Sequence, residues 1–342
     1  MVTLPSPFSE IPRVRLLYDR PADIEALPRL TEELGNGTSV WIAREDCNSG
    51  LAFGGNKVRK LEYVLADAVG RGADTLVTTG GTQSNHMRQT AAAAARLGLK
   101  VALYPRDAVT SDDAEYKYAG NIQLNEILGA ETFPVGSSED DAVAALEERG
   151  RTPYSIPSGA SAHPLGGLGY ARWAFELLER EAELGTSFDV VAVALGSGST
   201  LGGMVAGFGL ARKMGLEGAA GKRLIGYSIM RPPEEDAAGL VLGIARATGE
   251  RIGLGPGELA RGDDFEVDYS FLGGAYGRLD ERTASGIREL ARTEGILADP
   301  VYTGKAFTGL LHTARDGGFG GKNVLFCHTG GQAAISAYPK LR

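Results

Sequence analysis

The sequence predicts an α/β protein with mostly parallel sheets. Strand-like apolar runs alternate with helix-like segments along the chain, which is the pattern of repeated βαβ units. Glycine-rich turns follow several of these runs, and 342 residues suffice for two domains or one large α/β unit. Parallel sheets place their ligands at the carboxyl ends of the strands, so the turns after the strands are the first candidates for a functional site.

The first part of the chain contains three expected strands and two expected helices. Apolar runs at 40–44, 75–80 and 100–105 predict strands. Residues 60–72 form an amphipathic helical pattern that ends at a glycine, and residues 86–98 contain a run of alanines, a strong helix former. Each expected helix lies next to a strand, as a parallel sheet requires.

The rest of the chain repeats this alternation. We expect a helix over 110–130 and a strand over 131–135. Residues 188–195 predict a buried strand, followed by a glycine-rich turn and a helix through Ala211. The segments 223–229 and 323–331 are further β-rich runs.

Composition excludes several classes of protein. The chain is 43% hydrophobic and 23% charged, as soluble globular proteins are, and 35 Lys and Arg against 43 Asp and Glu give a net charge of −8. We therefore expect no nucleic-acid partner. Residues 1–21 contain prolines and charges instead of a signal-peptide core, and no apolar stretch could span a membrane, so we expect a cytoplasmic protein. Its four histidines and two cysteines lack metal-ligand spacing, which predicts no metal site.

The segment 196–203, GSGSTLGG, has the character of a phosphate loop. It follows an apolar strand and opens a helix, so its backbone N–H groups converge at the positive end of that helix. A tight packing turn between strand and helix is the alternative interpretation. The residues expected to hold a phosphate are Gly196, Ser197, Gly198, Ser199 and Thr200.

Lys57 follows Gly-Gly-Asn at an expected helix start. We expect the positive helix end and the neighbouring Arg59 and Lys60 to lower its pKa, because each disfavours a second cation. A lysine that loses its proton readily can form a Schiff base. The alternative is a solvated basic helix start.

Three further turns carry polar groups. Ser84 and Asn85, within GGTQSNHMRQ (80–89), either cap a helix or bind a substrate carboxylate. Tyr302 could act as an acid or base, or could simply pack beside a proline-anchored turn. The segment 327–331, CHTGG, is either a tight turn or a wall of the ligand site. A reactive lysine, a phosphate loop, a carboxylate loop and a tyrosine are together what pyridoxal 5′-phosphate (PLP) requires of a protein.

These segments resemble the 1-aminocyclopropane-1-carboxylate (ACC) deaminase / D-cysteine desulfhydrase family of PLP enzymes, over roughly residues 10–340. GGNKVRKLEY, GGTQSNHMRQ, HPLGGLGY, ADPVYTGKA and HTGG carry the resemblance. It implies the tryptophan-synthase-β-like fold, with open, twisted, mostly parallel sheets in two domains. Residues 1–60 plus 171–342 would form the large PLP-binding domain, and 61–170 the small α/β domain. It also implies a homodimer, which is common for soluble enzymes of this kind.

The resemblance assigns roles to residues of the site. Lys57 would bond PLP covalently, Asn85 would face the pyridoxal 3′-oxygen, and residues 196–200 would hold the phosphate. Ser84 would lie at the substrate carboxylate, and Tyr302 would be an acid, base or nucleophile. The remaining assignments are Tyr276 as a second site tyrosine, Gln83 and Thr303 at the substrate, and Thr329 at the cofactor.

Two positions bear on the substrate. Thr303 and Thr329 stand where ACC deaminases have glutamate and leucine, and they resemble D-cysteine desulfhydrases. At least one of them should lie near the pyridine nitrogen or in the adjoining pocket wall. A neutral hydroxyl there makes a weaker electron sink than a carboxylate, which suits β-elimination. In contrast, CNSGLAF (47–53) and the segment around His163 look more like ACC deaminase.

The sequence therefore favours a PLP-dependent β-eliminating lyase/deaminase. It would convert D-cysteine or a similar β-substituted alanine to pyruvate, ammonia and the leaving group. The alternatives are an ACC deaminase that gives α-ketobutyrate and ammonia, a cysteate sulfo-lyase, and a PLP-carrying protein without catalytic activity.

Overall fold

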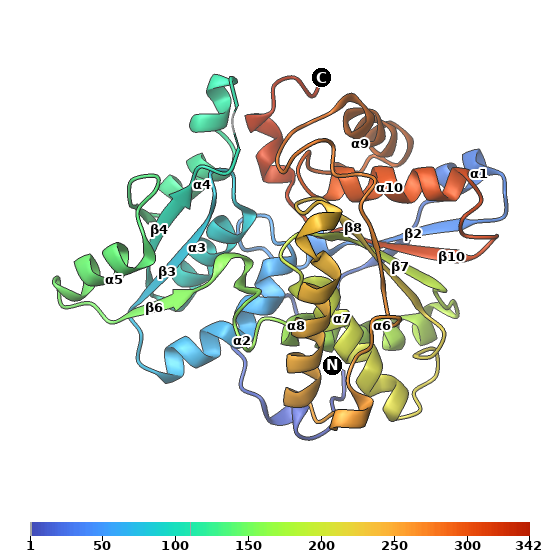
Figure 1. Ribbon diagram of the computed structural model, residues 1–342, viewed down its shortest axis with the longest axis horizontal. Coiled ribbons are helices and arrows are strands. Elements are labelled where there is room, and N and C mark those ends of the chain that lie inside the picture. The colour runs from blue at the N-terminus through green and yellow to red at the C-terminus, as the bar shows by residue number, and fades with distance from the viewer. Residues whose placement is uncertain (1, 110) are drawn as a thin grey trace.

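Two sheets lie side by side in the computed structural model, which describes residues 2–109 and 111–342 (Figure 1). The strand orders are β1-β2-β10-β7-β8-β9 in one sheet and β5-β4-β3-β6 in the other. All strand pairs are parallel except β1 with β2. The predicted fold class, an α/β protein with open, mostly parallel sheets, is confirmed.

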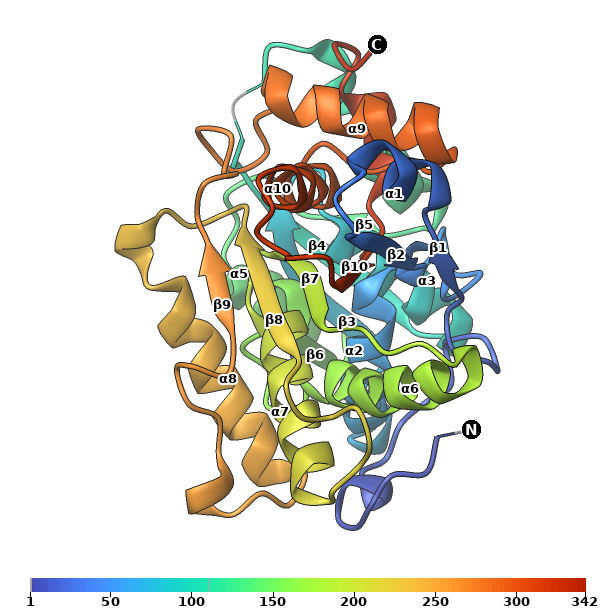
Figure 2. The same cartoon turned by 90° about the vertical axis from the view of Figure 1, so that its right-hand side faces the viewer.

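The six-stranded sheet is covered by helices on both faces (Figure 2). Its strands are β1 (Ile24–Ala26), β2 (Ser39–Ala43), β7 (Val190–Leu195), β8 (Arg223–Ser228), β9 (Glu266–Asp268) and β10 (Asn323–Cys327). One face is covered by α1 (Pro28–Leu34), α9 (Glu281–Glu294) and α10 (Thr303–Arg315). The other is covered by α6 (Leu168–Leu184), α7 (Ser199–Lys213) and α8 (Ala237–Arg251).

The four-stranded sheet is formed entirely within the range predicted for the small domain. Its strands are β3 (Thr75–Gly81), β4 (Lys100–Arg106), β5 (Glu131–Thr132) and β6 (Pro153–Ile156). The helices around it are α2 (Asn56–Gly70), α3 (Asn85–Leu97), α4 (Asn121–Ile127) and α5 (Glu139–Glu147). The division of the chain into domains at these boundaries stays a prediction, as does the homodimer.

The helix expected over 110–130 is wrong in part. Residue 110 lies outside the described residues, and the rest of the segment contains a short 3₁₀ turn at Ala114–Lys117 and then α4. Gly120, between them, has φ 62° and ψ −131°, a conformation that other residues adopt only with strain. That backbone conformation ends any continuous helix.

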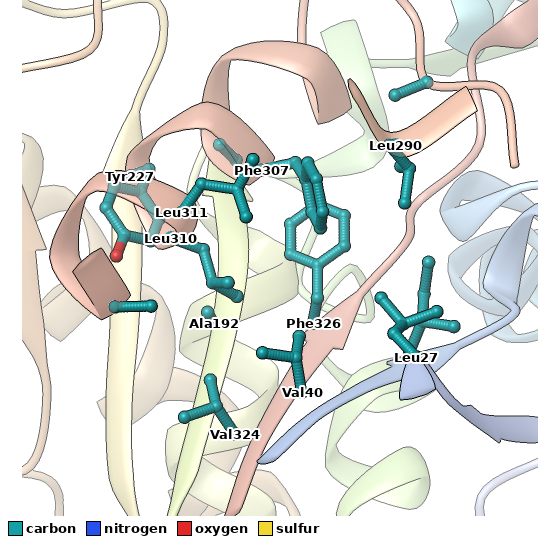
Figure 3. Packing of buried hydrophobic residues seen from close by; sticks show 14 of the residues in the cluster. Leu27, Val40, Ala192, Tyr227, Leu290, Phe307, Leu310, Leu311, Val324 and Phe326 are labelled. Atoms are coloured by element: carbon teal, nitrogen blue, oxygen red, sulfur yellow. The ribbon is translucent and has the colours of Figure 1, made fainter. Parts of the chain in front are cut away.

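The core of the larger sheet explains why its strands are apolar on both faces. Successive residues of β7 point to opposite sides, so Val190 and Ala192 join the cluster under α10 while Val191 and Val193 join the cluster over α6 and α7. Figure 3 shows the first cluster, in which side chains of α10 lie over those of β2, β7 and β10.

Close contact between α6 and α7 depends on glycines of α7. A Cβ added at Gly207 would lie 2.8 Å from both Ala171 Cα and Ala174 Cβ of α6. A Cβ added at Gly203 would lie 2.9 Å from Tyr170 Cβ. Because α7 begins at the GSGST turn, this packing also fixes the position of that turn.

We expect Gly207→Ala to destabilise the protein by about 2 kcal/mol, because the new methyl group meets backbone atoms of α6 that cannot move aside. Gly209→Ala is the matched control in the same helix. There the nearest atom to an added Cβ is Leu254 Cδ1 at 3.5 Å, so helix propensity should stabilise it by up to about 1 kcal/mol. Urea unfolding followed by circular dichroism measures both, and equal effects would contradict the packing argument.

Candidate functional site

A cavity of about 270 Å³ lies where the carboxyl ends of the two sheets face each other. Its walls come from the starts of α2 and α3, the turn between β7 and α7, the start of α10, and the segment after β10. Most of the predicted site residues line it, namely Lys57, Ser84, Asn85, Gly196, Ser197, Gly198, Thr200, Tyr276, Tyr302 and Thr329.

Lys57 lies in the first turn of α2, where glycine permits an abrupt entry into the helix. Gly55 has φ 120°, and a Cβ there would lie 2.8 Å from Gln89 Nε2. The side-chain oxygen of Gln89 accepts hydrogen bonds from the backbone N–H groups of Lys57 (3.0 Å) and Val58 (3.1 Å). The first turn of α2 is thus fixed to α3, and Lys57 is partly exposed to the cavity.

The pKa of Lys57 is lowered to about 8, and the main cause is burial. Lys60, one turn along α2, is fully buried, and burial together with Lys57 lowers the pKa of its own ammonium group well below the usual value. The pKa of Lys57 is therefore lowered, as the sequence predicts, but the cause is burial and not the neighbouring cations. The charge of Arg59 is taken up by ion pairs with Glu45 and Glu176, and the contact with Lys60 raises the pKa of Lys57 instead of lowering it.

The GSGST turn presents hydroxyl groups and helix N–H groups around a glycine. Gly198, with φ 92°, precedes α7 and contacts α8, where a Cβ would lie 3.0 Å from Ile244 Cδ1. The Ser161 hydroxyl lies 2.6 Å from that of Ser197 and 2.7 Å from that of Ser199. Thr200 accepts a hydrogen bond from the Asn56 amide at 3.0 Å, so this turn and the start of α2 are joined.

The start of α3 offers a second set of donors. Ser84 caps the helix by accepting the Met87 N–H at 3.2 Å, which leaves its own hydroxyl hydrogen free. Asn85 Oδ1 accepts from the Asn121 amide at 2.9 Å, so its amide nitrogen is turned to the other side. These groups and the helix N-terminus together suit a carboxylate.

Tyr302 and Tyr276 form a pair in the cavity wall. Their hydroxyl oxygens are 2.5 Å apart, and both rings line the cavity. Burial raises the pKa of Tyr302 well above its usual value, with Tyr276 adding to the shift, and burial also raises the pKa of Tyr276. Both phenols are therefore neutral at physiological pH and share one short hydrogen bond, along which a proton can move.

Three predicted residues lie outside the cavity lining. Ser199 is buried behind the turn in contact with Ser161. Gln83 points away from the cavity, because its amide donates to Tyr116 O and Ala119 O, both at 2.9 Å. The Thr303 hydroxyl donates to Asp299 Oδ1 at 2.7 Å and is fully buried. The sequence predicts that the Gln83 and Thr303 side chains contact the substrate. In the structure neither side chain lines the cavity, which does not agree with that prediction.

Sequence reasoning missed several residues of the lining. Arg106 is the last residue of β4, and the rule that ligands bind at strand carboxyl ends could have found it. Asn56 and His86 adjoin predicted residues. The Thr78 hydroxyl donates to Ile156 O, so His86 Nε2 must donate to Thr78 Oγ1 (2.8 Å). His86 Nδ1 is then a buried acceptor with no partner among the described residues. Burial lowers the pKa of His86 well below its usual value, so the ring is neutral.

The charge of the cavity is positive. Its charged lining residues are Lys57 and Arg106, and none of the described residues that line it is an aspartate or glutamate. The described chain also holds no cluster of three or more residues suited to a metal ion, and no helix within it is both long and apolar enough to cross a membrane. The site is therefore suited to small anions.

The residues present fit PLP. The GSGST turn offers hydroxyls and the unpaired N–H groups of the first turn of α7 to a phosphate, around a glycine with positive φ. Lys57, with a pKa of about 8, lies in the same cavity and supplies an amine for the aldehyde. The fold and this donor set define the class as a PLP-dependent enzyme.

Comparisons with known proteins show the same class. Residues 16–330 match the family model described as pyridoxal-phosphate dependent enzyme. The chain belongs to this family, within its ACC deaminase/D-cysteine desulfhydrase branch, as the resemblance implies. It is therefore an enzyme, which leaves the non-catalytic alternative unsupported.

The relatives cover nearly the whole chain. The ACC deaminase of Burkholderia vietnamiensis is 44% identical over 339 residues, covering 96% of this chain and 97% of the relative. That of Methylobacterium nodulans is 44% identical over 327 residues, covering 93% and 94%. A solved structure described as an ACC deaminase homologue has a TM-score of 0.83 at 34% identity, covering 98% of this chain and 96% of that one.

We expect cofactor-free protein to capture PLP covalently at a rate that rises with pH through about 8 and levels off above it, because only the neutral amine of Lys57 reacts. An unburied lysine would show a midpoint near 10.4. Absorbance of the bound cofactor measures the rate, and Lys57→Ala is the control that should lose it. Borohydride trapping of PLP on another lysine, found by mass spectrometry, would contradict the assignment.

Proposed function

We propose that this enzyme deaminates a small α-amino acid to a 2-oxo acid and ammonia, and that ACC is its substrate. The meeting of Lys57, Ser84 and the Tyr276–Tyr302 pair in one cationic cavity is the observation that carries the deamination. The choice of ACC is supported by relatives 43–44% identical that are named ACC deaminases. The comparisons thus favour ACC over D-cysteine, the substrate that the sequence analysis preferred.

In this proposal each group of the cavity has one task. PLP, when bound, withdraws electrons from the bonds around the substrate carbon that bears the amino group. The GSGST turn holds the phosphate, and the start of α3 with Ser84 holds the substrate carboxylate. Lys57 exchanges a proton readily near neutral pH because of its lowered pKa. The Tyr276–Tyr302 pair holds a proton at the phenol oxygens, within the same cavity.

D-Cysteine β-elimination is a second candidate, which a specific observation supports. The Thr303 hydroxyl is committed to Asp299, Thr329 presents a neutral side chain to the cavity, and no described lining residue is acidic. A ring nitrogen without a carboxylate partner is a weaker electron sink. Such a sink suits a reaction in which the leaving group carries the electrons away.

One product panel separates the candidates. We expect the purified holoenzyme to release α-ketobutyrate from ACC with a kcat/KM about tenfold or more above that for pyruvate release from D-cysteine, L-cysteine, β-chloro-D-alanine, D-serine or cysteate. Both products are quantified by chromatography after derivatisation. Fast pyruvate release with no α-ketobutyrate would reject ACC and support β-elimination, and release of sulfite from cysteate would support a sulfo-lyase.

The double variant Thr303→Glu with Thr329→Leu tests whether the two threonines set this balance. A carboxylate that extends from position 303 past Asp299 to the ring nitrogen would strengthen the electron sink, so the ratio of ACC to D-cysteine turnover should rise in the variant. The cofactor absorbance of wild type and variant is compared first, to show equal PLP content. An unchanged ratio at equal PLP content would show that both threonines serve packing alone.

A further inference from the structure

Arg106 lies at the substrate side of the cavity. It is the last residue of β4 and pairs with Gly81, the last residue of β3. Gly80, Gly81 and Ser84 line the same cavity, and a Cβ placed on Gly81 would lie 3.6 Å from Tyr276 Cε1. Arg106 is thus next to the turn that leads into α3, on the opposite side of the cavity from the strand β7 that carries the GSGST turn.

The guanidinium of Arg106 has no partner within the described chain. It makes no ion pair and no side-chain hydrogen bond there. The side chain is exposed and lines the cavity. Other arginines near the site are paired, such as Arg59 with Glu45 and Glu176. The adjoining Asp107 does not line this cavity. Five N–H donors in a fixed planar arrangement are therefore free to bind an oxyanion.

The position of Arg106 separates substrate from cofactor. The phosphate donors belong to the start of α7, after β7 in the six-stranded sheet. Arg106 belongs to the four-stranded sheet, beside the residues that precede Ser84. An anion bound by Arg106 would therefore be part of the amino-acid substrate.

We propose that Arg106 binds an oxyanion of the substrate and so selects substrates by their negative charge. This inference rests on the proposed function, because it assumes that an amino acid occupies the cavity. The oxyanion is either the α-carboxylate or a second anionic group on the β-carbon, such as a sulfonate. Both are planar or trigonal arrays of acceptors that a guanidinium binds through two parallel hydrogen bonds.

The variant Arg106→Gln removes the charge and leaves a shorter, neutral polar side chain. We expect KM for the best substrate to rise roughly tenfold with kcat changed less than about twofold, because the lost contact is made equally in the ground and transition states. KM of the wild type should rise with salt, and this rise should flatten in the variant. Arg106→Lys should restore the charge but only part of the affinity.

Lys100→Gln is the matched control. Lys100 is the first residue of the same strand, is exposed, and makes no ion pair in the described chain, but it lies at the far end from the cavity. Its variant loses the same charge and should keep the wild-type KM and salt dependence. If Arg106→Gln behaves like Lys100→Gln, the proposal is wrong.

Comparing cysteate with D-cysteine and ACC shows which oxyanion is bound. A similar rise of KM for all three indicates the α-carboxylate, and a rise confined to cysteate indicates the β-substituent. Binding is also followed by titrating the cofactor absorbance with D-alanine and cysteate, which requires no turnover. If wild type turns over none of the panel, the proposed function is wrong. The role of Arg106 is tested separately by the binding titration, and an equal Kd for wild type and Arg106→Gln would overturn it.

Discussion

The buried ion pairs of Arg59 hold the helix on which the site depends. Arg59, 2% exposed, donates to Glu45 after β2 at 2.5 Å and to Glu176 of α6 at 2.7 Å. A buried charge is tolerated only when it is paired, so these bonds fix the first turn of α2 between the sheets. Next to it, the Asn56 backbone N–H donates to Thr329 O at 3.1 Å and its amide to Thr200, so the segments after β2, β7 and β10 all meet at the lysine.

The electrostatic character of the cavity follows from helix ends more than from charged side chains. The N-termini of α2, α3, α7 and α10 all supply lining residues, and a helix N-terminus carries partial positive charge. The first N–H groups of α2 and α10 are already bonded, to Gln89 and Asp299. With no described carboxylate in the lining to oppose them, the helix ends favour anions. Burial, which lowers the pKa of Lys57, and helix ends, which suit phosphate and carboxylate, are thus found in the same cavity.

The sequence was sufficient for the parts of the cavity lining that follow turn-forming residues. Lys57, Ser84, Gly198 and Tyr302 each follow a glycine-rich or proline-anchored turn, and local pattern predicts such turns. Sequence reasoning failed where long-range hydrogen bonds determine which way a side chain points. Nothing near Gln83 in the sequence indicates that backbone carbonyls more than 30 residues away would turn its amide from the cavity. The cause of the lysine pKa also needed the fold, since pairing of Arg59 with two distant glutamates cannot be read locally.

Asp299 shows how a carboxylate close to the site is kept out of its chemistry. It is fully buried and accepts the N–H groups of Val301, Tyr302 and Thr303 as well as the Thr303 hydroxyl. A carboxylate so fully engaged serves as the cap of α10 and orients Tyr302. The Thr303 hydroxyl donates to this same buried carboxylate, so a negatively charged side chain at position 303 keeps the cap intact only if it points away from Asp299. The position of Tyr302 and the charge at position 303 are therefore coupled through Asp299.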